Sequence, residues 1–277
     1  MVILDGKTVS REILTDLKDT IRKNKLRPVL DMILVGDNPA SIKYTSLKQA
    51  TGLSIGIGGT IHHLAENTSE SAVIDLIKKL NHNPQVTAVM VQLPLPKGFN
   101  TEKIINTIDP TKDADGLTAV NLGRLFQKDK TVLVSATPLG IITLLDRYKV
   151  NLCGKYAVII NRSPFIGLAL MALFLNRDAT VSLCHSQTSN VRKLSRQADI
   201  IISGTGQSGY LTADYIRKGA VVIDVGMEVD FAKVKDKCSF ITPPTGGVGP
   251  MTVASLLANT VKIALKSSHF DSPNNRL

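Results

Sequence analysis

Three side chains in the first hundred residues could move a proton and hold a polar ligand. Tyr44 and Lys48 stand four residues apart in a segment with helical spacing, so they share one helix face. A lysine acts as a general base when its pKa is lowered. Gln92 ends a hydrophobic run just before two prolines, and the carboxyl end of a strand is a usual place for ligand contacts. A solvated helix face is the alternative interpretation of the Tyr44–Lys48 pair.

The acidic segment DPTKDADG at 109–116 carries Asp109, Asp113 and Asp115. Its spacing does not fit the calcium-loop pattern, although a metal loop or a solvated acidic turn is compatible with these residues. The more specific hypothesis is a single carboxylate that accepts two hydrogen bonds from an amidine-like ligand edge.

Two loops could hold the phosphates of a dinucleotide. The loop at 161–167 follows the first strand of a βαβ series and precedes a long apolar helix, which is the position that a dinucleotide fold requires. The loop at 204–209 contains a literal G-x-G-x-x-G, with Asp224 downstream as a ribose-binding acid, but only one further strand follows it. We therefore assign phosphate binding to 161–167 and expect 204–209 to be a glycine-rich turn at the sheet edge, in a position that could line the cofactor. A strand–loop–helix without a ligand is the remaining alternative.

Cofactor choice is suggested by the residues that follow the next strand. Arg162 and Ser163 can contact phosphate, and Gly167 permits close helix packing. CHS at 184–186 has no acid where NAD-binding folds place one to hold the ribose hydroxyls. The absence of this acid, with Arg162 nearby, favours NADP.

The elements that must position these residues follow from periodicity and turn signals. In the first half we expect a helix over 10–24 capped by Ser10, a strand over 30–36, a helix over 42–52 capped by Ser41, a helix over 70–80 and a strand over 86–96. In the second half, strands begin near 156, 179, 198 and 220, with helical segments of about ten residues between them, and a last helix covers 251–266. The alternation of short strands and helical segments predicts an α/β protein with a parallel sheet.

Composition limits the class of protein. The 277 residues are 43% hydrophobic and 20% charged, which suits one large or two small globular domains. We expect no signal peptide, because the start MVILDGKTVS has neither a basic n-region nor a long apolar stretch. We expect no membrane span, because the apolar run at 165–176 is too short and prolines and glycines interrupt 239–261. Three scattered cysteines predict neither a disulfide framework nor a zinc site, so a cytoplasmic location is expected.

The formal net charge is +10, whereas aromatic residues make up only 4% of the chain. Nucleic-acid binding would call for clustered basic residues interleaved with aromatics. A solvated basic surface, an acidic substrate or a phosphate-bearing cofactor explains the charge better.

Taken together, these segments resemble one family, the bifunctional methylenetetrahydrofolate dehydrogenase/methenyltetrahydrofolate cyclohydrolases, over roughly residues 1–266. The motifs that carry the resemblance are VGDNPAS at 35–41, VQLPLP at 91–96, DPTKDADG at 109–116, N-x-G at 121–123, TPLG at 137–140, RSPFIG at 162–167, CHSQT at 184–188, IDVG at 223–226 and TGGVGPMT at 245–252.

The resemblance implies a two-domain α/β protein with a folate cleft between the domains. Residues 1–136 would form an N-terminal catalytic domain, and 137–250 would form a Rossmann-like NADP domain. The helix 251–266 would pack back onto the catalytic domain, and 267–277 would be a flexible tail. The family usually forms homodimers through the cofactor domain, and neither of its reactions needs a metal, a nucleic acid or a membrane.

The same resemblance implies residue roles. Lys48 would be the catalytic lysine, Gln92 would tune its protonation, Tyr44 would pack on the folate, and Asp115 would hold the pterin edge. The cofactor would be bound by Asn161, Arg162, Ser163, Ser186 and Met227. The substrate would be a folate, polyglutamylated in its usual form. Hydride would pass from the methylene bridge to NADP, and water would then open the methenyl cation to the formyl product.

Departures from the family pattern lie mostly on the cofactor side. Asn161 replaces the glycine before Arg-Ser, so its side chain crowds the site, and the stretch between Met227 and Cys238 is shorter. Two alternatives therefore stay open: a monofunctional NAD-linked dehydrogenase of this family, and a non-catalytic binding protein that keeps the fold. The presence of Tyr44, Lys48, Gln92 and Asp115 favours the bifunctional enzyme.

Overall fold

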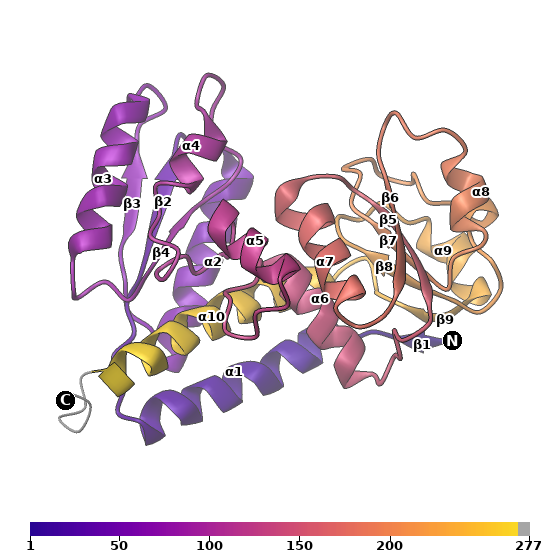
Figure 1. The fold of residues 1–277 in the computed structure, drawn as a ribbon, viewed down its shortest axis with the longest axis horizontal. Coiled ribbons are helices and arrows are strands. Elements are labelled where there is room, and N and C mark those ends of the chain that lie inside the picture. The colour runs from indigo at the N-terminus through magenta and orange to yellow at the C-terminus, as the bar shows by residue number, and fades with distance from the viewer. Residues whose placement is uncertain (271–277) are drawn as a thin grey trace. The chain divides into compact units, whose positions relative to one another are not determined.

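The computed structural model describes residues 1–270, which form two compact units (Figure 1). The small-sheet unit comprises Glu12–Asn121 and the chain from Leu256 onward, and the large-sheet unit comprises Met1–Arg11 and Leu122–Ser255. Residues 122–136, which the sequence analysis assigns to the first domain, thus lie with the large sheet. The assignment of functional domains stays a prediction.

The small-sheet unit contains three parallel strands in the order β3-β2-β4. They are β2 (Leu30–Val35), β3 (Ile61–Leu64) and β4 (Ala88–Val91). Every residue of β2 and β4 is buried, as expected for parallel strands covered on both faces. The strand predicted over 86–96 is confirmed only over Ala88–Val91. Strand β3 escaped prediction because two of its four residues are histidines.

Helix α1 (Gly6–Lys23) begins four residues before the predicted start at Ser10. The Asp5 carboxylate accepts hydrogen bonds from Thr8 N at 3.1 Å and Thr8 Oγ1 at 2.6 Å. Asp5 thus provides an acceptor for a backbone N–H in the first turn, which has no partner within the helix. The Ser10 hydroxyl instead donates to the carbonyl of Lys7. The prediction that Ser10 caps this helix is wrong.

Helix α2 (Pro39–Ile55) also begins earlier than predicted. Its cap is Asn38, whose side chain accepts a hydrogen bond from Ser41 N at 3.1 Å. Proline is favoured at the first helical position because it lacks the N–H that would go unpaired there. Ser41 therefore lies inside the first turn, and its prediction as the cap is wrong.

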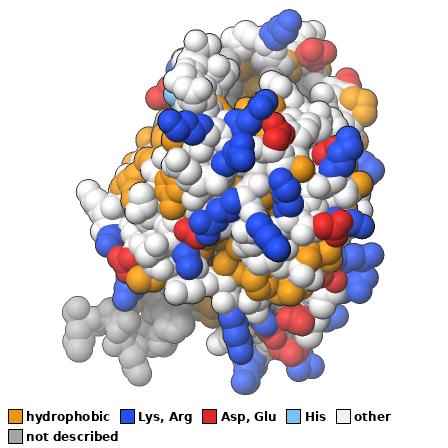
Figure 2. Space-filling view, turned by 90° about the vertical axis from the view of Figure 1, so that its right-hand side faces the viewer, with side chains coloured by type: hydrophobic (Ala, Val, Ile, Leu, Met, Phe, Trp, Pro, Cys, Tyr) orange, Lys and Arg blue, Asp and Glu red, His pale blue; other side chains and the backbone are white. Residues whose placement is uncertain are grey.

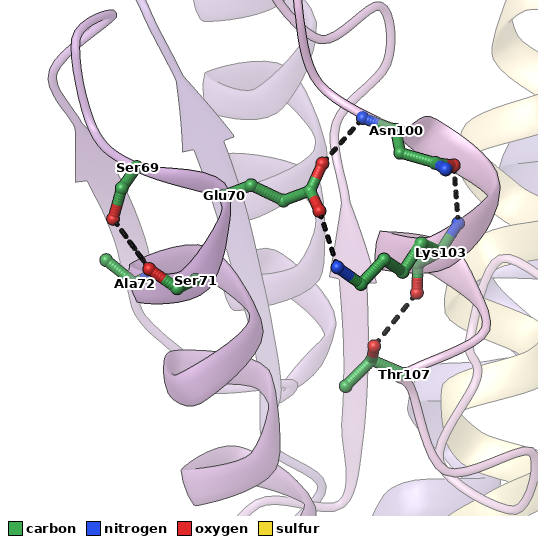
Figure 3. Close-up of polar contacts among 7 residues, drawn as sticks. All are labelled: Ser69, Glu70, Ser71, Ala72, Asn100, Lys103 and Thr107. Carbon is green, nitrogen blue, oxygen red and sulfur yellow. Dashed lines mark hydrogen bonds and ion pairs between the residues drawn. The ribbon is translucent and has the colours of Figure 1, made fainter.

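A polar cluster joins helix α3 (Glu70–His82) to helix α4 (Thr101–Ile105) (Figure 3). Glu70 accepts hydrogen bonds from Asn100 N at 2.8 Å and Lys103 Nζ at 2.9 Å, and these donors lower its pKa. The Asn100 side chain caps α4 by accepting from Lys103 N at 3.0 Å. The predicted helix over 70–80 is confirmed.

The large-sheet unit contains six parallel strands in the order β1-β9-β8-β7-β5-β6. The four predicted strands are confirmed as β5 (Tyr156–Ile160), β6 (Thr180–Cys184), β7 (Ile200–Ser203) and β8 (Ala220–Asp224). Strands β1 (Val2–Ile3) and β9 (Cys238–Ile241) extend the sheet beyond the prediction. Because β6 lies on one side of β5 and β7 on the other, the strand order reverses at β5, which creates a topological switch point.

The helical segments between these strands are mostly shorter than predicted. After β5, a π-helical turn (Pro164–Leu168) runs into α7 (Ala169–Leu175). The remaining helical elements of this unit's chain are α5 (Ala119–Phe126), α6 (Ala136–Arg147), α8 (Val191–Ser195), η2 (Ala213–Tyr215), α9 (Phe231–Val234) and η3 (Lys235–Lys237).

The last helix, α10 (Val248–Phe270), is long and apolar enough to cross a membrane by length and composition. However, 67% of its apolar window is buried inside the protein, so it is a core helix. Its Asn259 side chain donates to the carbonyl of Ala114 at 2.8 Å within the small-sheet unit. Residues 271–277 of the predicted flexible tail lie outside the described residues.

The three cysteines are free: Cys184 and Cys238 are buried and Cys153 is exposed. Figure 2 shows Lys and Arg side chains spread over the face in view, with acidic side chains between them. This distribution fits a solvated basic surface.

Candidate active site

Lys48 is a buried amine on the inner face of α2. Its side chain is only 7% exposed, and Nζ donates to Gln92 Oε1 at 3.0 Å and lies 3.8 Å from Met90 Sδ. Burial lowers the pKa of Lys48, because removing an ammonium group from water disfavours the charged form, while the charge of Asp115 opposes this effect. The alternative of a solvated lysine on a helix face is therefore excluded.

Gln92 is held in one orientation at the carboxyl end of β4. Its backbone N–H continues the sheet by donating to the carbonyl of Ile33 at 2.8 Å. Its Nε2 donates to the carbonyl of Leu93 at 2.7 Å, which turns Oε1 toward Lys48 and Thr45 Oγ1. The hydrogen-bond acceptor of the Lys48 amine is therefore a fixed neutral group, and the charge of the nearby Asp115 opposes the effect of burial on the pKa of Lys48.

The acidic segment runs beside β4, not out into solvent. Val89 N donates to the carbonyl of Lys112 at 2.8 Å, and Ala114 N donates to the carbonyl of Val89 at 3.2 Å. These two hydrogen bonds place Asp115 near Lys48. Burial raises the pKa of Asp115, the charge of Lys48 opposes this, and Asp113 raises it further.

Asp113 is a supporting residue that the sequence analysis did not separate from its neighbours. It is fully buried, and its Oδ2 accepts from Thr118 N at 2.8 Å and Asn121 Nδ2 at 3.0 Å. Among the side chains of residues 1–267, no group of three or more potential ligands could hold a metal ion, so the metal-loop alternative finds no support there.

Tyr44 lies one helical turn before Lys48 and is 51% exposed. The two side chains thus present an aromatic ring at the surface and an amine beneath it. A buried amine of lowered pKa beside a carboxyl group of raised pKa is suited to proton transfer.

In the large-sheet unit, the predicted phosphate loop forms the start of the helical segment after β5. Ser163 caps it by accepting from Ile166 N at 3.2 Å, and Pro164 occupies the first turn. A Cβ atom on Gly167 would lie 2.0 Å from the carbonyl oxygen of Asn161, so only glycine fits there. The close packing predicted for Gly167 is confirmed.

Asn161 connects the two loops that the sequence analysis compared. Its Oδ1 accepts from Ser163 N at 2.8 Å and Gly167 N at 3.2 Å, and its Nδ2 donates to the carbonyl of Gly204 at 2.6 Å. Gly204 directly follows β7, so this carboxamide spans the switch point between β5 and β7.

Two backbone amides of the 204–209 turn are not available to a ligand, because the buried Glu228 already binds them. Thr205 N and Gly206 N each donate to the Glu228 carboxylate at 2.6 Å. Asp224, the alternative ribose-binding acid, is buried and accepts from Glu228 N and Val229 N. The turn also follows an interior strand rather than an edge strand. The structure therefore favours the 161–167 loop for phosphate, and sequence reasoning missed Glu228 entirely.

Arg162, Ser186 and Met227 are exposed at the carboxyl edge of the large sheet. Ile160 pairs with Cys184 across β5 and β6, so Arg162 and Ser186 each lie two residues beyond this pair, on adjacent loops. This placement suits two side chains that share one phosphate group.

Comparison with known proteins extends these observations over nearly the whole chain. The family model described as "Tetrahydrofolate dehydrogenase/cyclohydrolase, catalytic domain" matches residues 4–115, and the model for the "NAD(P)-binding domain" of the same proteins matches residues 135–268. The chain belongs to the tetrahydrofolate dehydrogenase/cyclohydrolase family.

Individual relatives agree with this assignment. The "Bifunctional protein FolD" of Thermodesulfovibrio yellowstonii is 44% identical over 275 residues, which cover 95% of this chain and 96% of the relative. The crystal structure of the bifunctional enzyme FolD from Campylobacter jejuni superposes with a TM-score of 0.94 at 40% identity and covers 96% of this chain and 99% of its own. The Trypanosoma brucei FolD structure, described as complexed with NADP cofactor and inhibitor, has a TM-score of 0.91 at 32% identity and covers 97% of this chain and 98% of its own.

Proposed function

We propose that the chain catalyses both reactions of its family: NADP-dependent oxidation of 5,10-methylenetetrahydrofolate to the methenyl form, and hydrolysis of that form to 10-formyltetrahydrofolate. The observation that carries the proposal is the buried Lys48 amine, held 3.0 Å from Gln92 Oε1 with its pKa lowered by burial. A buried amine of lowered pKa suits an acid–base catalyst better than a binding site that holds an anion through a charged lysine.

In the oxidation, the chain mainly has to position the folate. The methylene carbon is already close to an iminium ion, so hydride loss depends on orientation more than on a base. When bound, the nicotinamide ring accepts the hydride. Asp115 is proposed to accept two hydrogen bonds from the amidine-like edge of the pterin, and the exposed ring of Tyr44 is proposed to pack on the folate.

In the hydrolysis, Lys48 is proposed to move the protons. Its neutral amine accepts a proton from the water that adds to the methenyl carbon. The resulting ammonium then gives this proton to the ring nitrogen as the carbon–nitrogen bond breaks. The hydroxyl group of the adduct loses its own proton to solvent as the formyl C=O forms. Gln92 keeps the amine at this place through the Nζ–Oε1 hydrogen bond. An amine with its pKa lowered toward neutrality can serve in both directions.

The residues at the switch point fit a dinucleotide that carries a 2′-phosphate. Gly167 allows the start of the helical segment to pack closely against the backbone of the phosphate loop. No acidic residue follows β6 at 184–186, where it would repel the 2′-phosphate. We propose that Arg162 and Ser186 bind the 2′-phosphate, and that Asn161, Ser163 and Met227 contact the rest of the cofactor.

The proposal also includes a homodimer formed through the large-sheet unit, a cytoplasmic location and a polyglutamylated form of the folate. These three points rest on the family resemblance alone. Sedimentation velocity of the full chain measures the first of them.

An absorbance assay with methylenetetrahydrofolate, run separately with NADP and NAD, tests the proposed function. Reduced nicotinamide and the methenyl intermediate are followed together. We expect NADP-linked oxidation and disappearance of the methenyl absorbance on hydrolysis. Reduction of NAD alone, with accumulating methenyl product, would instead identify a monofunctional NAD-linked dehydrogenase.

A further inference from the structure

Glu228 is a buried carboxylate that neither reaction uses. None of the four hydrogen bonds given below comes from a positively charged side chain. Glu228 is 2% exposed. Its Oε2 accepts from Ser203 Oγ at 2.5 Å, Thr205 N at 2.6 Å and Thr205 Oγ1 at 2.9 Å, and its Oε1 accepts from Gly206 N at 2.6 Å. Four donors around one buried carboxylate make a site that is built for a negative charge.

The loop after β8 is shaped to deliver this carboxylate. The Asp224 side chain accepts from the backbone N–H of Gly226, Glu228 and Val229 and so folds the loop back on itself. Met227 adopts a left-handed backbone conformation with φ of 62°, which is uncommon for a residue other than glycine. A Cβ atom on Gly226 would lie 3.2 Å from Glu228 Oε1, so the glycine leaves room for the carboxylate.

Glu228 acts on a turn that borders the switch point. The turn follows β7, and its Gly204 carbonyl accepts from Asn161 Nδ2 at 2.6 Å. Asn161 in turn accepts from Ser163 N and Gly167 N of the phosphate loop. Hydrogen bonds at both ends of the Ser203–Gly206 backbone therefore link Glu228 to the loop that is proposed to bind the cofactor.

We propose that Glu228 is a positioning residue for the cofactor. Its carboxylate occupies the anion-binding position of the Ser203–Gly206 turn and so excludes the cofactor phosphates from the glycine-rich motif. It also holds the turn in the shape that orients Asn161 and the phosphate loop. The inference rests on the proposed function and adds to it the role of the G-x-G-x-x-G motif.

Replacing Glu228 with glutamine tests the role directly. An amide keeps the size of the side chain but sets an NH2 group against the backbone N–H groups that the carboxylate accepts. We expect the dissociation constants of NADP and NAD, measured by titration of the full chain, to rise together by about tenfold, as for loss of a charge-assisted hydrogen bond. Methenyl hydrolysis, which uses no nicotinamide, should keep its wild-type rate.

Asp199→Asn is the matched control. Asp199 precedes β7 at the opposite end of the same strand, where its carboxylate accepts from Tyr156 N at 2.9 Å and pairs with Arg217. This variant also replaces a carboxylate of the large-sheet unit with an amide, but far from the turn. It should lower the melting temperature without changing cofactor affinity, so a fall in affinity from general destabilisation alone would appear in both variants.

Chemical rescue separates an anion site from a packing effect. In Glu228→Ala, formate or acetate should restore much of the NADP affinity, because either ion can occupy the vacated donors. Chloride at equal ionic strength should not. If the Glu228 variants fail to fold, Thr205→Val removes one hydroxyl donor and keeps the carboxylate, and about a threefold loss of affinity for both cofactors is expected.

Two outcomes overturn the inference. One is wild-type NADP affinity in Glu228→Gln or, if that variant does not fold, in Thr205→Val. The other is an equal affinity loss in the Asp199→Asn control. If the wild-type chain itself binds neither NADP nor NAD, the proposed function fails instead, and stabilisation of Glu228→Ala by formate still tests whether the turn is an anion site.

Discussion

The Lys48 amine donates a 3.0 Å hydrogen bond to Gln92 Oε1, and Gln92 cannot turn away because its Nε2 is bound to the carbonyl of Leu93. A neutral acceptor lets Lys48 lose its proton more readily than a carboxylate partner would. Burial lowers the pKa of Lys48, the charge of Asp115 opposes this effect, and Gln92 fixes the place of the amine.

Lys48→Met keeps the bulk of the side chain and removes the group that transfers protons. We expect methenyl hydrolysis to fall by roughly 100-fold or more, because this step depends on general acid–base catalysis. Oxidation should fall less, since it depends on positioning. Lys43→Met, on an exposed position of the same helix, is the control. A wild-type hydrolysis rate in Lys48→Met would disprove the assigned role.

Gln92→Glu replaces the neutral acceptor with a charged one and should raise the pKa of Lys48. The neutral amine is the active base, so wild-type hydrolysis falls as the pH drops below the lowered pKa of Lys48. In the variant this limb should move to higher pH, and the rate at neutral pH should decrease. The pH profile of hydrolysis measures the shift. Gln85→Glu, which adds the same charge on the exposed surface, should leave the profile in place.

Asp115→Ala should weaken folate binding and therefore reduce both activities together. Loss of a charge-assisted pair of hydrogen bonds corresponds to about 1.5–3 kcal/mol. Titration of the variant with folate and, separately, with NADP measures the effect. Asp109→Ala in the same segment is the control. Reduced NADP affinity with unchanged folate affinity would contradict the assignment of Asp115.

Arg162→Ala should weaken NADP binding by about 1.5–3 kcal/mol, or roughly 10–100-fold. NAD lacks the 2′-phosphate, so its affinity should change much less, and the preference for NADP should shrink. Arg177→Ala removes a partly buried arginine of the same unit that pairs with Asp146, and it should change neither affinity. Equal losses for both cofactors would show that Arg162 only supports the loop.

Four strands of the large sheet, β5, β6, β7 and β8, were predictable from the sequence. Strand β7 and strand β8 are buried along their whole length, which produces short apolar runs between turn signals. Strand β1 has two residues and β9 has four, so neither carries a pattern long enough to detect. Hydrogen bonds to neighbours distant in sequence define them, as for Val2 opposite Phe240.

The sequence by itself determined the family, the βαβ order and the residue types available for chemistry: a lysine and a tyrosine one helical turn apart, a glutamine at a strand end and an arginine in the first loop of the series. These are local properties of spacing and motif. The tertiary structure decided the burial and the hydrogen-bond partners of each group. Burial lowers the pKa of Lys48, and a carboxylate from a later loop occupies the glycine-rich turn that the motif alone would assign to a phosphate. Desolvation and hydrogen bonding depend on which distant segments pack together, and spacing along the chain does not contain that information.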